Sequence, residues 1–308
     1  MELVKVVDLS AVWSWETNFE KLDFLRFLRA SAIQLDFLKF LSDSAMRSPI
    51  EMCRNLEYLF IDSARRGKLQ NIIFKMVKLR HVHFGGEVYS YNREIMHESF
   101  QINNLEAFSY FLIKYENDLK FLRSSPFLHR LKCILSSEWN PYEPYYYPTL
   151  NFLNHLESLS ILFRASGIIS NLISLPLTLR KLTLTDFKLN SKEMKMIGEL
   201  PKLEVLKLES VVIEDDQWNP NEGEFQQLRF LKLDNFLLVE LNVSSDNFPR
   251  LEQLVLRRFD TAIPSSVGDI PTLVKIIVER CKKQVEESAL KILEEQTDEF
   301  LKVIIISW

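Results

Sequence analysis

Glycine and cysteine are both scarce in this chain. Only 7 of the 308 residues are glycine, which leaves little material for the glycine-rich loops that bind phosphate groups. The three cysteines, Cys53, Cys133 and Cys281, lie far apart in the sequence. Because an odd and widely spaced set does not make a disulfide framework, we expect reduced thiols and a cytoplasmic location.

Long apolar runs and an excess of one charge sign are missing as well. No segment approaches the roughly 18 uncharged apolar residues that a membrane-spanning helix needs. The first ten residues, MELVKVVDLS, contain Glu2, Lys5 and Asp8, so they make a poor signal peptide. The formal net charge is −4, which gives no support to a polyanionic partner. We therefore expect neither a membrane span nor a nucleic-acid partner.

The familiar constellations of catalytic and metal-binding residues do not occur either. There is no G-x-S-x-G elbow, and the Gly-Lys pair in RRGKLQ (65–70) lacks the loop and the Ser or Thr of a phosphate-binding loop. His81 and His83 have an i, i+2 spacing that can chelate a metal, but no second pair completes a site. The sequence predicts that the protein is not an enzyme and holds no metal or cofactor.

What the sequence does contain is a repeated hexamer. LRKLTL at 179, LEVLKL at 203, LRFLKL at 228 and LEQLVL at 251 share the frame apolar-x-x-apolar-x-apolar. The frame recurs at intervals of 21 to 31 residues, most of them within the range of a leucine-rich repeat. Its first positions are Val4, Leu25, Leu56, Leu79, Leu105, Leu128, Leu156, Leu179, Leu203, Leu228, Leu251, Leu273 and Phe300.

The alternation inside each hexamer is the period of a β-strand. At 203, positions 4 and 6 (Leu206 and Leu208) should face one way, and positions 3, 5 and 7 (Val205, Lys207 and Glu209) the other. One strand cannot bury its apolar side alone, whereas parallel stacking of repeats makes a continuous core. We predict an α/β leucine-rich-repeat solenoid of horseshoe shape, with the sheet on its concave face and loops, short helices or 3-10 turns on its convex face.

The spacing predicts one domain over 1–308, with irregular repeats at 1–104, regular repeats at 105–281 and a C-terminal cap at 282–308. Position 9 is apolar in the regular repeats, which predicts a packed spine. The spine residues are Phe187, Val211, Phe236, Phe259 and Cys281.

The cap should be a helix followed by a last strand in FLKVIII. In VEESALKILEEQ (285–296), one helical face is apolar, and such a helix covers the terminal edge that a solenoid leaves open. The residues on that face are Val285, Ala289, Ile292 and Leu293.

A partner should contact the outward-facing positions 3, 5 and 7. Basic residues recur there on successive strands, interleaved with acidic residues such as Glu209 and Asp234. A mixed array favours a protein partner over nucleic acid, and exposed aromatic rings on a rigid platform are typical hot spots. The predicted protein-binding residues are Tyr58, Phe60, Lys181, Lys207, Phe230, Lys232, Arg257 and Lys275.

Two loops are further candidates. The insertion SSEWNPYEPYYYPTL (136–150) crowds aromatic rings between prolines, and it either forms a recognition loop or packs against the solenoid. The acidic loop 214–224 could contact a basic surface. The aromatic residues of the possible recognition loop are Trp139, Tyr142, Tyr145, Tyr146 and Tyr147.

Three stretches carry a resemblance to a known family. They are IEDDQWNPNEGEFQQLRFLKLDNF (213–236), IPSSVGDIPTLVKIIVERC (263–281) and ESALKILEEQ (287–296). In these stretches the chain resembles the leucine-rich-repeat region of plant intracellular nucleotide-binding leucine-rich-repeat immune receptors. More narrowly, it resembles their coiled-coil class and the late-blight-resistance-like group of the nightshade family. The resemblance is strongest from about residue 150 to 308.

The resemblance implies a function and leaves one alternative open. In that family such repeats sense a pathogen effector or a guarded host protein, and they hold a nucleotide-binding switch domain inactive. No nucleotide-binding segment occurs in the chain, so we expect the sensor part of a truncated or longer receptor, without ATP binding. The alternative is the substrate-recognition repeats of an F-box type ubiquitin ligase adaptor.

Overall fold

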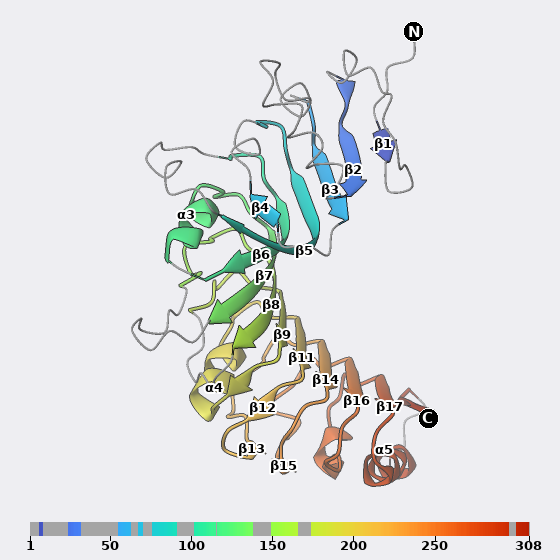
Figure 1. The fold of residues 1–308 in the computed structure, drawn as a ribbon. Helices are drawn as coiled ribbons and strands as arrows, with labels where there is room; N and C mark the ends of the chain where they lie inside the picture. Colours follow the sequence, from blue (N-terminus) through green and yellow to red (C-terminus); the bar gives the residue numbers. More distant parts are fainter. Residues whose placement is uncertain are drawn as a thin grey trace, which may run out of the picture. The chain divides into compact units, whose positions relative to one another are not determined.

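The structure of the chain, a computed structural model, consists of two compact units (Figure 1). The first unit comprises residues 1–136 and 152–156, and the second comprises residues 137–151 and 157–308. Each unit is considered by itself below. The residues that the structure describes are 6–8, 24–31, 55–62, 67–69, 76–90, 102–114, 116–137, 149–165, 174–295 and 300–307.

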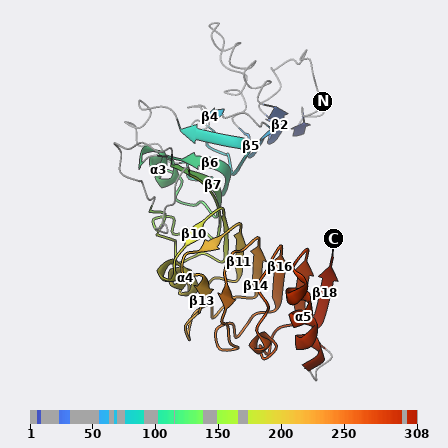
Figure 2. The ribbon, with the colours of Figure 1, turned by 60° about the horizontal axis from the view of Figure 1, so that its bottom comes forward.

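In the second unit, the repeats contribute one strand each to a parallel sheet, as Figures 1 and 2 show. Neighbouring strands pair in step, so that Leu206 lies opposite Leu182 on one side and Leu231 on the other. This register confirms the predicted parallel sheet and its frame. In spatial order the strands are β8 (Ser158–Ala165), β9 (Lys181–Thr185), β11 (Val205–Glu209), β14 (Phe230–Asp234), β16 (Gln253–Arg257), β17 (Lys275–Glu279) and β18 (Lys302–Ile306).

The two sides of each strand differ in burial as the alternation predicts. In β11, Leu206 and Leu208 are fully buried, while Val205, Lys207 and Glu209 on the other side are half-buried. The same alternation occurs in β16 and β17. Burying one such leucine side chain contributes about 1.5–3 kcal/mol, so the stacked leucines are the main source of cohesion between repeats.

The repeats that begin at Leu179, Leu203, Leu228, Leu251 and Leu273 each turn at position 8 through a residue with a left-handed backbone. The N–H of this residue continues the ladder by one bond: Ser210 donates to Asp234 O at 2.8 Å, and Arg258 to Glu279 O at 3.0 Å. Glycine adopts this conformation freely, whereas other residues lose roughly 1–2 kcal/mol. Because glycine is scarce, these turns lower the stability of the fold, and the burial of the leucine core must offset that loss. The residues are Asp186 (φ 61°), Ser210 (φ 52°), Asn235 (φ 50°), Arg258 (φ 48°) and Arg280 (φ 54°).

The opposite side of the second unit carries short elements, as predicted. The helix α4 (Ser191–Gly198) begins at Asn190, whose side chain accepts from the N–H groups of Lys192 and Glu193, while the Glu193 carboxylate accepts from the Asn190 N–H. This reciprocal capping fixes the start of a short helix. The remaining elements are β10 (Lys188–Leu189) paired with β12 (Val212–Ile213), β13 (Gln217–Trp218) paired with β15 (Glu240–Leu241), and the 3-10 turn η4 (Ser265–Val267).

The predicted spine is present on this side. Phe187, Val211, Phe236 and Phe259 are buried, which confirms the prediction at these positions. Cys281 is only half-buried, and its Sγ lies 3.4 Å from Leu256 O. The spine therefore consists mainly of rings packed behind the strands.

The second unit ends with the predicted helix and strand. The helix α5 (Lys283–Glu295) buries Val285, Ala289 and Ile292, and it packs against β17, β18 and η4 (Figure 2). Phe300, which the sequence puts at position 1 of the last hexamer, is 78% exposed, and the neighbouring Leu301 is buried instead. The chain has just left α5 at this point, so Leu301 supplies the anchor before β18.

The first unit also forms a parallel sheet. Leu59 and Ile61 are buried, as are Val82 and Phe84 in the next repeat, so the leucine frame is correct in these irregular repeats too. Its strands in spatial order are β1 (Val6–Asp8), β2 (Phe27–Ser31), β3 (Tyr58–Asp62), β5 (His81–Ser90), β6 (Ala107–Ile113) and β7 (Arg130–Ser137), with β4 (Gly67–Leu69) beside β5 and the helix α3 (Glu116–Arg123) after β6.

Among the described residues of the first unit, the apolar frame of the hexamers fails at Tyr110. The hexamer at 105 puts Tyr110 at the inward position 6, but the pairing of β6 with β7 shifts between Ser109 and Phe111. Tyr110 has a left-handed backbone (φ 66°) and is half-buried. Phe111 is fully buried in its place. The extra residue is a β-bulge, which turns the tyrosine ring outward and puts a fully apolar ring in the core.

Candidate functional site: the outward strand face

The outward strand face consists of the side chains at positions 3, 5 and 7. In the second unit its centre is a network of opposite charges, which we call the charged lattice. Lys232 Nζ lies 2.9 Å from Glu209 Oε1 and 3.1 Å from Asp234 Oδ2. Arg257 Nε lies 3.2 Å from Glu279 Oε1, and its Nη1 lies 3.6 Å from Asp234 Oδ2. Cations and carboxylates therefore neutralise one another across four strands.

Asp234 is the hub of the charged lattice. Its side chain is only 4% exposed, and it accepts two hydrogen bonds from Arg258, at 2.9 and 2.5 Å. Burial by itself would raise the pKa of the Asp234 carboxyl, but hydrogen bonds from Arg258 and Lys232 outweigh it and lower that pKa. Burial likewise opposes the charge of Lys232, yet its bonds to Glu209 and Asp234 raise its pKa. Both groups are therefore ionised near neutral pH.

The predicted basic residues are thus placed in different surroundings. Lys232 and Arg257 belong to the charged lattice, whereas Lys207 Nζ lies 5.7 Å from the centroid of the Phe230 ring. Lys181 is exposed and Lys275 is half-buried, each on its own strand. Their contact with a partner stays a prediction.

The outward face of the first unit carries aromatic rings, which we call the aromatic platform. The rings of Tyr58 and His81 are stacked, with centroids 4.5 Å apart and planes 7° apart. The Phe60 ring lies 5.3 Å from that of Phe27 and 5.5 Å from that of His83. The in-step register places these rings in two rows, at position 3 of three successive strands and at position 5 of two of them. The platform residues are Phe27, Tyr58, Phe60, His81, His83 and, at the bulge, Tyr110.

The sequence singled out only part of this platform. Tyr58 and Phe60 were predicted as anchors, and the structure brings them together with Phe27 and both histidines. The signal in the sequence is a ring at position 3 of three consecutive hexamers, namely Phe27, Tyr58 and His81. Tyr110 could not have been found this way, since it reaches the platform only through the bulge.

His81 joins the aromatic platform to charged neighbours. Its Nε2 lies 3.7 Å from Glu106 Oε2, and its Nδ1 lies 3.5 Å from Arg130 Nη2. Burial lowers the pKa of His81, Arg130 lowers it further, and Glu106 acts in the opposite direction. The imidazole is therefore neutral at pH 7 and presents an uncharged ring to Tyr58. Within the described stretches, no group of three or more His, Cys, Asp or Glu side chains could hold a metal ion.

A row of ion pairs borders the outward face at position 2 of the repeats, and we call it the edge ladder. Arginine and glutamate alternate there on neighbouring repeats. The pairs are Arg26–Glu57 (3.4 Å), Arg80–Glu106 (2.5 Å), Arg180–Glu204 (2.5 Å) and Arg229–Glu252 (2.9 Å). Exposed pairs of this kind contribute little stability, but they leave the border of each sheet electrically balanced.

The structure describes the acidic loop 214–224 but not the aromatic residues of the possible recognition loop. The possible recognition loop with Trp139, Tyr142, Tyr145, Tyr146 and Tyr147 lies outside the described residues. In the acidic loop, Asp215 Oδ2 accepts from Ser191 N at 2.9 Å and from Ser191 Oγ at 2.5 Å. These bonds, the side-chain bond first, lower the pKa of Asp215. The Asp215 carboxylate of this loop therefore accepts hydrogen bonds from the first residue of α4.

Trp218 and Phe225 belong to the stretch 213–236, which carries part of the family resemblance and which we call the family signature. Both are core residues. The Trp218 ring packs edge-on against those of Phe225, Phe236 and Phe248, with centroids 5.7 to 6.0 Å apart. Gly198 permits this packing, because a Cβ there would lie 2.9 Å from Glu224 Cβ and 3.0 Å from Phe225 Cε2. The signature is thus explained by packing between a helix end and the next loop.

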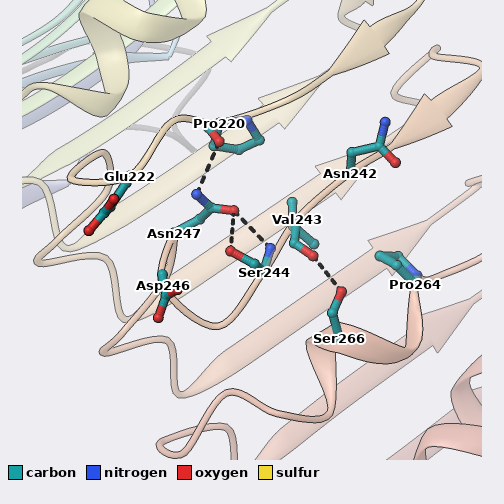
Figure 3. Close-up of a pocket in the computed structure, with 9 residues that line it drawn as sticks. All are labelled: Pro220, Glu222, Asn242, Val243, Ser244, Asp246, Asn247, Pro264 and Ser266. Carbon is teal, nitrogen blue, oxygen red and sulfur yellow. Dashed lines mark hydrogen bonds between the residues drawn. The ribbon is translucent and has the colours of Figure 1, made fainter.

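Figure 3 shows an open pocket of about 480 Å³ beside these loops. The buried Asn247 holds its walls together, donating to Pro220 O at 3.0 Å and accepting from Ser244 N at 2.8 Å. The hydroxyls of Ser244 and Ser266 donate to Asn247 Oδ1 and to Val243 O. These bonds occupy both hydroxyls in holding the loops together, and they make neither into a nucleophile.

Comparisons with known proteins connect this geometry to a family. No family model matches the chain. The late blight resistance protein homolog R1B-23 of Solanum demissum is 34% identical over 311 residues, which cover 97% of this chain and 24% of that protein. This chain is a homologue of late blight resistance proteins. A second late blight resistance homolog of the same species is 34% identical over 324 residues, covering 100% of the chain and 24% of that protein.

The homology confirms the resemblance and extends it beyond residues 150–308 to nearly the whole chain. The chain spans about a quarter of the length of these relatives. A crystal structure of a TLR13–ssRNA13 complex has a TM-score of 0.52 and 19% identity, covering 86% of this chain and 37% of that one. This likeness concerns the fold, which is that of a leucine-rich-repeat protein. No helix in the described stretches is long and apolar enough to cross a membrane.

Proposed function

We propose that the chain is the protein-recognition module of a plant immune receptor and acts without catalysis. Its outward strand face contacts a pathogen effector or a guarded host protein in the cytoplasm. The observation that carries this proposal is the combination of homology to late blight resistance proteins with an in-step parallel sheet. A rigid sheet with variable outward side chains provides an extended binding surface.

Regulation of a nucleotide-binding switch domain is the second part of the proposal. It is supported by the relatives, which are about four times as long as this chain, so that further domains have room to adjoin the repeats. The buried Cys133, whose thiol pKa is raised to about 12 by burial, is an inert core residue that suits a reducing compartment. No specific observation favours the alternative of an F-box type adaptor.

Affinity capture tests the proposal. The tagged 308-residue chain is expressed in leaves, and captured proteins are quantified from infected and uninfected tissue. Two strand-face variants are compared with wild type: Tyr58→Ser with Phe60→Ser in the first unit, and Lys207→Glu with Phe230→Ser in the second. Lys192→Glu, an exposed change on α4, is the matched control.

We expect one defined protein to be enriched by wild type and by the control, and to be lost with at least one strand-face variant. Circular dichroism and thermal unfolding establish that each variant is folded. If every folded variant captures the same proteins as wild type, binding does not use the strand face and the proposal is wrong.

A further inference from the structure

The aromatic platform lies two strands away from a pair of cations. Arg130 and Lys132 on β7 are both exposed, and the pairing of the strands aligns them with His81 and His83 across Ala107 and Ser109 of β6. The intervening side chains are small, and the Arg130 side chain crosses Ala107, so that its Nη2 lies 3.5 Å from His81 Nδ1. Two strand spacings of about 4.8 Å separate the backbones of the two features by roughly 10 Å.

These two cations differ from those of the charged lattice. No carboxylate of the described residues lies within ion-pair distance of Arg130 or Lys132, and Arg130 Nη2 lies 3.5 Å from Nδ1 of the neutral His81 ring. In the charged lattice, by contrast, Lys232 and Arg257 each contact two carboxylates. The positive charge beside the platform is therefore available to an outside carboxylate.

On this basis we propose that the first unit binds an extended acidic polypeptide segment. An apolar or aromatic side chain rests on the aromatic platform, and carboxylates about three residues further along contact Arg130 and Lys132, since three extended residues span roughly 10 Å. The inference rests on the proposed function and deepens it, because it names the binding unit and the chemistry of the partner.

A polypeptide fits this surface better than a nucleic acid does. Rings and cations together also occur in sites for single-stranded nucleic acid, where a phosphate accompanies every base. Here the rings are bordered by the balanced ion pairs of the edge ladder, so no continuous row of unpaired cations accompanies them to match successive phosphates. Two available cations match a segment with a few carboxylates at one end.

The second unit offers no equivalent site. Lys181 is exposed and makes no cation–π contact with a ring of the described residues, and at Lys207 the cation lies over the Phe230 ring, so that each group covers the other. Lys181 and Lys302 are exposed at position 3, and no carboxylate among the described residues pairs with either. These two lysines therefore form a matched control for the pair on β7.

Fluorescence anisotropy of the full chain with labelled probes tests the proposal. The acidic probe is a nine-residue peptide of Gly and Ser with one Trp, and Glu at three and five residues after it. The neutral probe replaces both Glu by Gln, and the nucleic-acid probe is a nine-nucleotide oligouridylate. Sedimentation of the unlabelled chain reports binding between copies.

We expect the acidic peptide to bind roughly fivefold more tightly than the neutral one, as two exposed charge pairs allow. The double variant Arg130→Gln with Lys132→Gln should abolish that preference, while Lys181→Gln with Lys302→Gln should retain it. Tyr58→Ser with Phe60→Ser should weaken both peptides by a factor of ten or more, as loss of aromatic anchors does. The exposed cation variants keep the test valid even where ring removal impairs folding.

Several outcomes would overturn the proposal. They are equal binding of the two peptides, tighter binding of oligouridylate, a preference that survives the cation variant on β7, and occupation of the platform by a second copy. The plant capture experiment separates the two proposals. A partner lost only with the second-unit variant leaves the proposed function intact and refutes the first-unit site, whereas a partner that no strand-face variant loses refutes the proposed function.

Discussion

At positions 3 and 5 the first unit carries clustered rings, whereas the second unit carries the charged lattice at positions 5 and 7. Both surfaces stand on the same leucine frame, with Leu59 and Leu206 buried alike. The inward residues are thus constrained by packing, and the outward residues are free to differ. A charged lattice that neutralises itself adds little attraction for a partner, while rings held half-exposed keep apolar area available.

The largest expected effect concerns the shared frame. Leu59→Ala and Leu206→Ala remove the same position-4 side chain from the first and the second unit. Both leucines are at most 2% exposed, so each change leaves a cavity and should cost about 2–5 kcal/mol. Hydrogen exchange resolved by segment measures the loss in each unit separately. Lys207→Ala is the control, and a Leu206→Ala loss no greater than that of the control would mean that the strand frame is displaced.

Asp234→Asn tests the charged lattice and should have the next largest effect. It removes the carboxylate that Lys232, Arg257 and Arg258 share. Those cations are partly exposed, so we expect a loss of about 1–3 kcal/mol at pH 7 in urea unfolding, below the cost of breaking a fully buried pair. Glu252→Gln in the edge ladder is the control and should cost at most about 1 kcal/mol.

The same variant also changes the response to acid. The folded pKa of Asp234 is lowered, so its stabilisation is complete above the unfolded carboxyl pKa of about 4 and is lost as pH falls through the folded pKa. Asp234→Asn should therefore lose less stability than wild type below about pH 4. Parallel curves for the two proteins would show that Asp234 is not the hub.

The sequence predicted the inward side of this molecule far better than the outward side. Positions 4 and 6 could be predicted because burial requires an apolar residue at every second place, and the α5 face followed from the helical period. The charged lattice depends on which residues of neighbouring strands face each other, as Asp234 and Arg257 do. That register becomes definite only once repeats of unequal length are aligned in space.

Backbone features were hidden for a different reason. Left-handed residues are usually inferred from glycine or asparagine, yet position 8 is filled by Arg258 and Arg280 as readily as by Asn235. The conformation is imposed by the strands on either side. The bulge at Tyr110 was hidden because Tyr110 and Phe111 are both acceptable core residues.

Asp186→Val tests whether the regular turn of the second unit requires that conformation. Asp186 is exposed with φ 61°, and a β-branched residue is strongly disfavoured there. We expect a loss of about 1 kcal/mol, seen as faster exchange in β9 and β11. Asp186→Gly is the control and should lose less. A valine variant as stable as the glycine variant would mean that the turn adopts another conformation.

The smallest effect should be a pH response confined to the first unit. The folded pKa of His81 is lowered, by burial first and then by Arg130, although Glu106 opposes this. The unfolded chain therefore takes up a proton more readily, so stability is lost as pH falls below about 7 through the unfolded histidine pKa near 6.5. The groups facing His81 are the Tyr58 ring, Glu106, Arg80 and Arg130.

His81→Phe is the variant that isolates this response, because it keeps a ring against Tyr58 and cannot titrate. Exchange in β3 and β5, corrected for the intrinsic rate, should accelerate between pH 7 and pH 5 in wild type and less so in the variant. The second unit should remain unchanged over this range, because the lowered pKa of its hub Asp234 keeps that carboxylate ionised throughout it. An equal response in the variant would assign the pH dependence to another group.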